Sequence, residues 1–431
     1  MKISIKKKIK GTLYMISKIG VIHLLSANFM LQIVGFGIQI FLVRILSIDN
    51  IGRIKVMQSF IAIATIVAGL GGNTAILKLC SEDIDISQKK IIFINGVKFN
   101  FITSLVVLVI CILCSFTNIY SADNIINVSL RYYSLIIPFN VLNDLGMVYL
   151  QSQKKIKDMS RIQIIIKAIS VVFIILFSSL FSLNGFVCAY VITGIIGFII
   201  FIILFKNEFS GFLKIRIVKE HIKNIFNIGK YAFATNSIGQ ILSSVDILFM
   251  NYFINDNSKI GFFGIAQLII AGLMIIPSTF NQIIVPYISE NCKFRCKVIK
   301  IYNGYYKKII SLMFGVIAIS FFIIPFFIPI IFGSKYVNSI NYFRILLIGL
   351  FFWSITATRG IVLLGIGQIK YNFYIVLITA FFNLLFNYIF ILRFGANGAA
   401  YGTSLAYLVG SIISKKIFYK AINNKYQCKN N

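Results

Sequence analysis

Apolar runs of about 20 residues recur along the whole chain, and they constrain its fold more than any other feature. A helix of that length crosses roughly 30 Å of hydrocarbon. Of the 431 residues, 58% are hydrophobic and 13% are charged, whereas a typical soluble domain has about 25% charged residues. We therefore expect an all-α integral membrane protein.

Run length and flanking charge predict about twelve transmembrane helices. The longest internal segment between runs, 206–230, carries apolar residues at helical spacing with Lys and Arg between them. It is expected to form an amphipathic helix on an anionic membrane surface. The predicted cores are 22–43, 56–77, 99–116, 128–150, 162–181, 185–205, 231–254, 260–285, 309–332, 342–364, 372–392 and 398–414.

These runs imply five parts along the chain. They are a basic amphipathic N-terminal segment (1–20), an N-lobe of six helices (21–205), a cytoplasmic linker (206–230), a C-lobe of six helices (231–418) and a basic cytoplasmic tail (419–431). The N-terminal segment is interpreted as an uncleaved interfacial helix, because no small-residue cleavage site follows the first apolar run.

The positive charge indicates topology and not nucleic-acid binding. The net charge is +30, but the 42 Lys and Arg lie in short clusters between apolar runs and no basic domain stands outside them. Most of these residues fall in alternate segments, as cytoplasmic loops require. We expect both termini to be cytoplasmic, in a multi-pass protein of a bacterial cytoplasmic (inner) membrane.

The two halves of the chain resemble each other. "NIGRIKVMQSF" after the first span matches "KIGFFGIAQLI" after the seventh, so that Ile51-Gly52 corresponds to Ile260-Gly261 and Gln58 to Gln267. Three weaker matches follow in the same order: "LCSE" with "YISE", "QKK" with "QIK", and "LNGFVCAY" with "ANGAAYG". This order predicts a tandem repeat of two six-helix lobes in parallel orientation, as in transporters whose site lies between the repeats.

The basic turn and glycine after the first span, the Gly and Asn of the second, and the late "FGANGAAYG" resemble the polysaccharide (O-antigen, Wzx-type) flippases of the MATE-like MOP exporter superfamily. The resemblance covers nearly the whole chain by span count and repeat order. It implies two lobes forming a V that opens to each side in turn. It also implies that undecaprenyl-pyrophosphate-linked oligosaccharide moves from the cytoplasmic to the periplasmic leaflet. The expected partners are this lipid-linked oligosaccharide, membrane lipids, a polymerase and a chain-length regulator.

Five basic residues within or beside the spans are candidates for a cationic, substrate-binding cleft, because an intramembrane charge needs a cavity or a partner. For those near span ends the alternative is snorkelling to the interface, and for Lys167 the two interpretations are balanced. Arg359 lies deeper, where a guanidinium fork suits a pyrophosphate. The candidates are Arg44, Arg131, Lys167, Arg344 and Arg359.

Two carboxyl groups, Asp144 and Asp246, are the candidates for binding a coupling proton or sodium ion, since burial disfavours the charged form of a carboxyl group. Polar stripes on the first, fourth and seventh spans suggest cleft-lining amides. The alternative is hydrogen bonding between helices within one lobe. These amides are Asn28, Gln32, Gln39, Asn140, Asn236 and Gln240.

The first turn, between the first and second spans, holds three basic residues on the predicted outer side. Two explanations are open: Arg44 and Arg53 pair with Asp49 to hold the turn, or Arg44 lines the mouth of an anion-conducting cleft.

Two other function classes are considered. A MATE-type multidrug or organic-cation antiporter would need an acidic, aromatic cleft, whereas the intramembrane candidates here are mostly basic. A membrane polysaccharide polymerase would need a large outer loop, and the predicted loops are short. For a glycosyltransferase, the Asp83-x-Asp85 pair has the spacing that could hold a metal and a nucleotide sugar, but it lies in a short charged loop where a solvated turn explains it. The sequence predicts no enzyme activity, no metal site and no cofactor.

Overall fold

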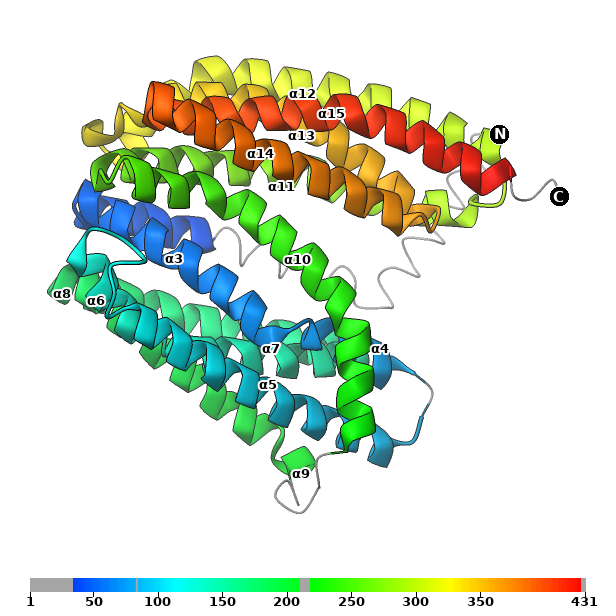
Figure 1. Ribbon diagram of the computed structural model, residues 1–431, viewed down its shortest axis with the longest axis horizontal. Helices are drawn as coiled ribbons and strands as arrows, with labels where there is room; N and C mark the ends of the chain where they lie inside the picture. The colour runs from blue at the N-terminus through cyan, green and yellow to red at the C-terminus, as the bar shows by residue number, and fades with distance from the viewer. Residues whose placement is uncertain (1–33, 83, 210–217, 428–431) are drawn as a thin grey trace. The chain divides into compact units, whose positions relative to one another are not determined.

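The computed structural model describes residues 34–82, 84–209 and 218–427, and every regular element in these ranges is a helix (Figure 1). After a helix over Val34–Ile45, the order is α3 (Ile48–Gly69), α4 (Gly72–Ser81), α5 (Ile86–Cys114), α6 (Asn124–Tyr133), α7 (Ile136–Ser152), α8 (Ile156–Leu204), α9 (Lys206–Phe209), α10 (Lys219–Phe253), α11 (Asn257–Glu290), α12 (Arg295–Phe332), η1 (Ser334–Tyr336), α13 (Ser339–Gly365), α14 (Ile369–Phe394) and α15 (Ala396–Gln427).

Ten of the twelve predicted spans fall on these helices. The second, 56–77, is interrupted by the break between α3 and α4, and residues 22–33 of the first, like the predicted N-terminal segment 1–20, lie outside the described residues. Within the described residues, seven helices are long and apolar enough to cross a membrane, and α6 with α7 forms an eighth, bent by 43°. Helix α8 has 49 residues and contains two predicted spans, 162–181 and 185–205, which meet at Ser182, where φ is 51°. The all-α membrane fold expected from the apolar runs is confirmed.

The chain forms two compact units. Unit 1 comprises residues up to Leu46, Phe60–Tyr120 and Asn124–Ala234, and unit 2 comprises Ser47–Ser59, Ser121–Asp123 and Thr235–Asn431. The second unit thus includes the first turns of α3 and the short segment before α6. The domain boundaries proposed from the sequence stay a prediction.

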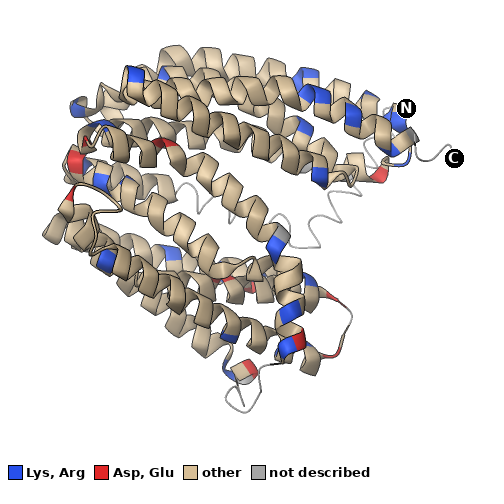
Figure 2. Cartoon of the chain, viewed as in Figure 1, with Lys and Arg blue, Asp and Glu red and all other residues tan. Residues whose placement is uncertain are grey.

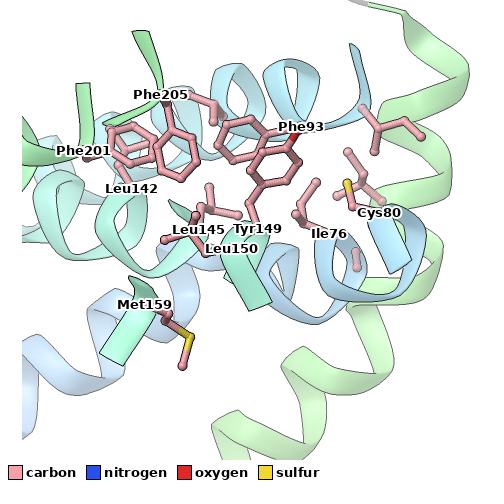
Figure 3. Packing of buried hydrophobic residues seen from close by; sticks show 14 of the residues in the cluster. Ile76, Cys80, Phe93, Leu142, Leu145, Tyr149, Leu150, Met159, Phe201 and Phe205 are labelled. Carbon is pink, nitrogen blue, oxygen red and sulfur yellow. The ribbon is translucent and has the colours of Figure 1, made fainter. Parts of the chain in front are cut away.

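An aromatic cluster forms the core of unit 1 (Figure 3). The rings of Phe93 on α5 and Tyr149 on α7 stack with centroids 3.9 Å apart. Phe201 and Phe205 from the end of α8 pack on the same ring of Phe93, at 6.4 and 5.3 Å. Ile225 of α10 is completely buried in this cluster. The first turns of α10, which lie in the predicted linker, are therefore anchored in the core of unit 1.

Helices α3 and α4 are separated by a sharp break at Leu70 and Gly71, both with positive φ. A Cβ on Gly71 would come within 2.1 Å of the carbonyl oxygen of Gly229, so only glycine allows α10 to approach so closely. The Thr103 hydroxyl donates to the Ala68 carbonyl at 2.6 Å and satisfies one carbonyl freed by the break.

The core of unit 2 includes a cluster where α11, α12, α13, α14 and α15 meet. Helix α15 continues to Gln427, beyond the predicted span, and Phe418 and Ile422 are buried in the cluster. The hydroxyl of Tyr426 donates to the carbonyl of Cys292 at 2.8 Å. Residues 419–427, which the sequence assigns to a tail, are thus a docked helix end; Figure 2 shows the Lys and Arg that this end carries.

Repeat-equivalent residues contact each other inside unit 2. Ser258 is 209 residues after Asp49, the offset of the sequence repeat, and its hydroxyl donates to the Asp49 carboxylate at 2.5 Å. A Cβ on Gly52 would meet the carbonyl oxygen of Asn257 at 1.9 Å, and one on the equivalent Gly261 would meet the carbonyl oxygen of Ile48 at 2.6 Å. Adding 209 to Gly52 and to Ile48 gives Gly261 and Asn257, so the repeat converts one glycine contact into the other, as in a two-fold interface.

Candidate functional site

The most developed polar site in unit 2 surrounds Asp246 on α10, whose side chain is only 2% exposed. Thr403 Oγ1 and Asn387 Nδ2 donate to Asp246 Oδ1 at 2.6 and 2.9 Å. Gln267 Nε2 donates to Oδ2 at 3.1 Å, and Asn383 Nδ2 donates to Thr403 Oγ1 at 3.0 Å. We call these five residues the Asp246 cluster; they come from α10, α11, α14 and α15.

Two buried oxygens of the Asp246 cluster, Asn383 Oδ1 and Asn387 Oδ1, have no hydrogen-bond partner among the residues that the structure describes. A buried polar atom without a partner costs about 1–3 kcal/mol. The cluster also supplies the Asp246 carboxylate and the Thr403 hydroxyl oxygen. Hard cations in proteins take oxygen ligands of these kinds. The cluster therefore brings together oxygen groups of the kinds that bind a small cation: a carboxylate, a hydroxyl and two side-chain amides.

The other predicted polar residues of α10 lie outside this cluster. Asn236 is exposed, and Gln240 donates to Ser244 Oγ at 2.8 Å on its own helix. The structure thus joins Asp246 to amides of α11 and α14 and not to the stripe predicted on its own helix. The cleft-lining role of Asn236 and Gln240 stays a prediction.

Arg359 on α13 is buried in a second site of unit 2, with 5% of its side chain exposed. Nη1 donates to the Ser411 carbonyl and to Ser414 Oγ, the latter at 2.7 Å. Nε donates to Tyr302 Oη at 3.3 Å and Nη2 to Tyr306 Oη at 3.2 Å. We call these five residues the Arg359 clamp. Its acceptors are all neutral, and they tie α13 to α12 and α15.

Arg344 lies near the start of α13, with its guanidinium 5.0 Å from the ring centroid of Phe321 and its side chain exposed. This geometry suits a cation–π contact at the end of a span. The role of Arg344 in substrate binding stays a prediction.

A pocket of about 400 Å³ lies within unit 2. Its walls contain Trp353, the single tryptophan of the chain, together with amide, hydroxyl and aliphatic side chains, and no charged residue among the described lining. We call it the Trp353 pocket. It is lined by Leu242, Ser278, Asn281, Trp353, Thr356, Ala357, Gly360, Ile361, Leu364, Asn372, Ile375, Val376, Thr379 and Tyr407.

In unit 1, Asp144 lies on an exposed face of α7, in the middle of a predicted span, with Asn140 half-buried one turn before it. Lys167 on α8 is half-buried, and its Nζ lies 4.0 Å from the position of a Cβ on Gly35 in the helix Val34–Ile45. Gln39 is half-buried on that same helix. The structure therefore places Lys167 against the helix of Gln39.

Arg44 is exposed at the end of the helix Val34–Ile45. Arg131 on α6 lies with its guanidinium 3.7 Å from the ring centroid of Phe116, and its Nε donates to Ser115 Oγ at 3.2 Å. Local contacts thus engage Arg131, as expected for a residue at a span end. Asn28 and Gln32 lie outside the described residues.

The sequence suggested that Arg53 pairs with Asp49, but the structure gives Arg53 other partners. Its Nε contacts the Asp123 carboxylate at 2.7 Å, and its Nη1 donates to Asn50 Oδ1 at 2.9 Å. Asn257 also donates to the Asp123 carboxylate, at 2.7 Å. Asp123 lies 70 residues further along the chain, so a partner this distant could not be found from the turn alone.

Sequence reasoning missed four members of the Asp246 cluster as site residues: Gln267, Asn383, Asn387 and Thr403. Two signals were available. Gln267 matches Gln58 in the repeat, and Asn383 and Asn387 stand four residues apart in the apolar run "FFNLLFNYIF", which puts them on one helix face.

Comparisons with known proteins agree with this architecture. A family model described as "Polysaccharide biosynthesis protein" matches residues 41–341. An uncharacterised membrane protein of Methanocaldococcus jannaschii is 25% identical over 286 residues, which cover 61% of this chain and 54% of that protein. The matched region thus spans about half the length of that relative.

Two solved structures share the fold. A multidrug resistance MATE family transporter of the MOP superfamily, in an inward-facing conformation, superposes with a TM-score of 0.72 at 16% identity, covering 91% of this chain and 94% of its own. The lipid II flippase MurJ, in an inward closed conformation, gives 0.73 at 18% identity, covering 94% and 90%. The chain therefore has the MATE-like fold.

Proposed function

The chain belongs to the polysaccharide biosynthesis protein family, and from this membership we propose that it is a flippase for a lipid-linked oligosaccharide. It is a multi-pass membrane protein with the MATE-like fold. The proposed substrate is an undecaprenyl-pyrophosphate-linked repeat unit of O-antigen or capsule. The protein moves it from the cytoplasmic to the outer leaflet of the bacterial cytoplasmic membrane, with both termini in the cytoplasm.

The observation that carries an ion-coupled mechanism is the Asp246 cluster. A buried carboxylate in a predicted span is costly unless it has a function or a compensating partner. Asp246 has only neutral donors, and two buried amide oxygens beside it have no partner among the described residues. Amide oxygens bind a sodium ion but do not accept a proton under physiological conditions. Sodium is therefore the coupling ion that this donor set favours, and a proton is the alternative that Asp246 alone would support.

We propose that the cation supplies the free energy for alternating access. Binding neutralises Asp246 and engages the amides of α14 and the hydroxyl of α15, so the bound and free states of unit 2 differ in how these helices are joined. A ligand shifts a conformational equilibrium only by its difference in affinity for the two states. The difference proposed here lies in the contacts of Asn383, Asn387 and Thr403.

The substrate proposal rests on the family and on the basic residues of unit 1. Lys167 lies in a predicted span, and Arg44 stands at the end of one. A phosphate-bearing lipid requires such cationic groups, while its chain stays in the bilayer. Arg44, Arg131, Arg344 and Arg359 each have an interaction within the protein in this structure, so their substrate contacts would require an exchange of partners.

Complementation tests the proposal directly. A bacterial strain that lacks its own O-antigen flippase accumulates the lipid-linked precursor inside. Expression of this chain is expected to restore surface polysaccharide and deplete the precursor, and the Asp246→Asn variant, present in the membrane at the same level, is expected not to. Normal complementation by that variant would remove the coupling role.

A multidrug antiporter is the second candidate, because a MATE multidrug transporter shares the fold. Efflux of a fluorescent organic cation such as ethidium separates the two functions. The flippase proposal predicts no efflux above that of cells carrying the empty vector. A transport function also leaves no enzymatic step for the chain to perform.

A further inference from the structure

The Trp353 pocket lies directly beside the Asp246 cluster. Three of its lining residues stand one helical turn from a cluster residue, each on a different helix: Leu242 before Asp246 on α10, Thr379 before Asn383 on α14, and Tyr407 after Thr403 on α15. Residues four apart lie on the same face of a helix, one above the other. The inner end of the pocket is therefore one layer of side chains away from the cluster.

The three lining residues are all displaced from their cluster residues toward the same end of the helices. Helices α14 and α15 are antiparallel neighbours joined at Gly395, and both Thr379 and Tyr407 lie further from that turn than the cluster residues of their own helices. On α10, Phe253 contacts Tyr388 of α14, with ring centroids 5.6 Å apart, so the C-terminal end of α10 lies toward the same turn. Leu242 is consequently displaced away from it too.

The pocket extends from this inner end to the end of the bundle where α14 begins. On α14 its lining runs from Thr379 back to Asn372, which is the fourth residue of the helix and about 10 Å from Thr379 at 1.5 Å per residue. Leu364, at the end of α13, also lines the pocket and is 43% exposed. The pocket thus reaches from the surface level of the span to its middle.

The walls are mainly aliphatic and aromatic, and they carry a few neutral polar side chains, Ser278, Thr356, Asn372 and Thr379, with no charged residue in the described lining. The hydroxyls of Ser278, Thr356 and Thr379 donate to carbonyls of their own helices, so each oxygen keeps lone pairs that can contact a cation. The guanidinium of Arg359, although next in sequence to the lining Gly360, is directed to acceptors on α12 and α15. Neutral polar groups can replace part of a cation's water shell without trapping the ion.

We propose that the Trp353 pocket is the entry route by which the coupling sodium ion reaches the Asp246 cluster. This inference rests on the proposed function, since it assumes that the cluster binds a cation. Tyr407 stands at the inner end, one turn from Thr403.

The first test measures exchange of ²²Na⁺ on the purified full-length protein. Ala357→Leu narrows the pocket without touching the cluster. Raising a barrier slows entry and exit equally, so we expect both rates to fall by about tenfold while the Kd stays within about threefold. Thr356→Val, which keeps the size and removes one hydroxyl, is expected to slow exchange in the same direction. Ala271→Leu, the same enlargement at an exposed position on α11, serves as the control.

The outcomes separate the two proposals. The route is supported if Asp246→Asn loses sodium binding and if the pocket variants, but not the control, exchange sodium more slowly. If the native protein binds sodium and the folded variants Ala357→Leu and Thr356→Val exchange it at the native rate, the route is overturned and the coupling site is unaffected. No sodium binding by the native protein, or none that depends on Asp246, overturns the coupling site and the route with it.

A second test uses Trp353 itself and does not depend on sodium binding. Because it is the only tryptophan, its fluorescence reports on the pocket alone. Caesium ion, a water-borne quencher, is expected to quench it in the native protein and less effectively in Ala357→Leu. Quenching by a brominated lipid but not by caesium would show a lipid-filled pocket and would overturn the route.

Discussion

Among the described residues of unit 2, two charged side chains are buried, Asp246 and Arg359, and their surroundings differ. The Arg359 clamp engages Nε, Nη1 and Nη2 of the guanidinium with neutral oxygens on two neighbouring helices. The Asp246 carboxylate also accepts hydrogen bonds from neutral groups, but two buried amide oxygens of its cluster have no partner among the described residues. Four engaged N–H groups fit a structural joint at Arg359, whereas unpartnered oxygens beside a buried carboxylate fit a ligand site.

The largest expected effect comes from breaking the clamp. Arg359→Ala removes hydrogen bonds to α12 and α15 and leaves buried acceptors and a void, so we expect a loss of about 3–5 kcal/mol in the free energy of unfolding. Thermal melting of the purified protein measures it, with Arg393→Ala, an exposed arginine on α14, as the control. If Arg359→Ala melts like the native protein and still fails to flip substrate, the guanidinium binds substrate instead.

The next largest effect is expected at the Asp246 cluster. Asp246→Asn keeps the shape of the side chain and removes its charge, and we expect sodium affinity to fall by about 100-fold or more, or at least 2.7 kcal/mol. Melting should change little, because the new side chain has the same size and its amide oxygen can still accept from Thr403 and Asn387. Equilibrium binding of ²²Na⁺ measures the loss, and Glu290→Gln, an exposed carboxylate, is the matched control. Unchanged affinity would contradict the site.

Smaller changes test the neutral ligands of the cluster. Thr403→Val is nearly the same size and removes one oxygen, so sodium affinity should fall by about tenfold. Asn383→Leu removes the unpartnered amide oxygen and is expected to act in the same direction. Calorimetric titration with sodium chloride, against potassium chloride at equal ionic strength, measures both. A variant that binds sodium normally would show that its oxygen is not a ligand.

The smallest effect is expected in unit 1. Lys167→Ala removes a half-buried cation near Gly35, and we expect flipping of a lipid-linked oligosaccharide to fall by about three- to tenfold, as for one phosphate contact. Sodium binding should not change, because the cluster lies in the other unit. Arg161→Ala, an exposed cation on the same helix, is the control. Equal effects of the two substitutions would show that Lys167 acts only through the net charge of the protein and not through a specific contact with substrate.

The sequence was sufficient for the all-α membrane fold because a run of apolar residues can be read locally. It also singled out Asp246 as a candidate, since a carboxyl group in such a run is conspicuous. It could not identify the ligands of Asp246, because Gln267, Asn387 and Thr403 come from three other helices, up to 157 residues away. Hydrogen bonds between distant helices depend on packing, which spacing along one helix does not reveal.

The Arg359 and Arg53 cases show the same limit. Depth in a span singled out Arg359, but nothing local shows that Ser411, Ser414 and two tyrosines engage its guanidinium. Arg53 had a nearby acid, Asp49, and the structure pairs it with Asp123 instead. The internal repeat was easier to recognise from the sequence. Its offset of 209 residues recurs in the structure, in the hydrogen bond between Asp49 and Ser258.

The central claim is that the Asp246 cluster couples a cation gradient to flipping. Proteoliposomes containing a fluorescent lipid-linked oligosaccharide, with and without a sodium gradient, test it most directly. We expect the gradient to accelerate flipping by the native protein by about tenfold or more and to have no effect on Asp246→Asn. Equal acceleration in both proteins would contradict the claim.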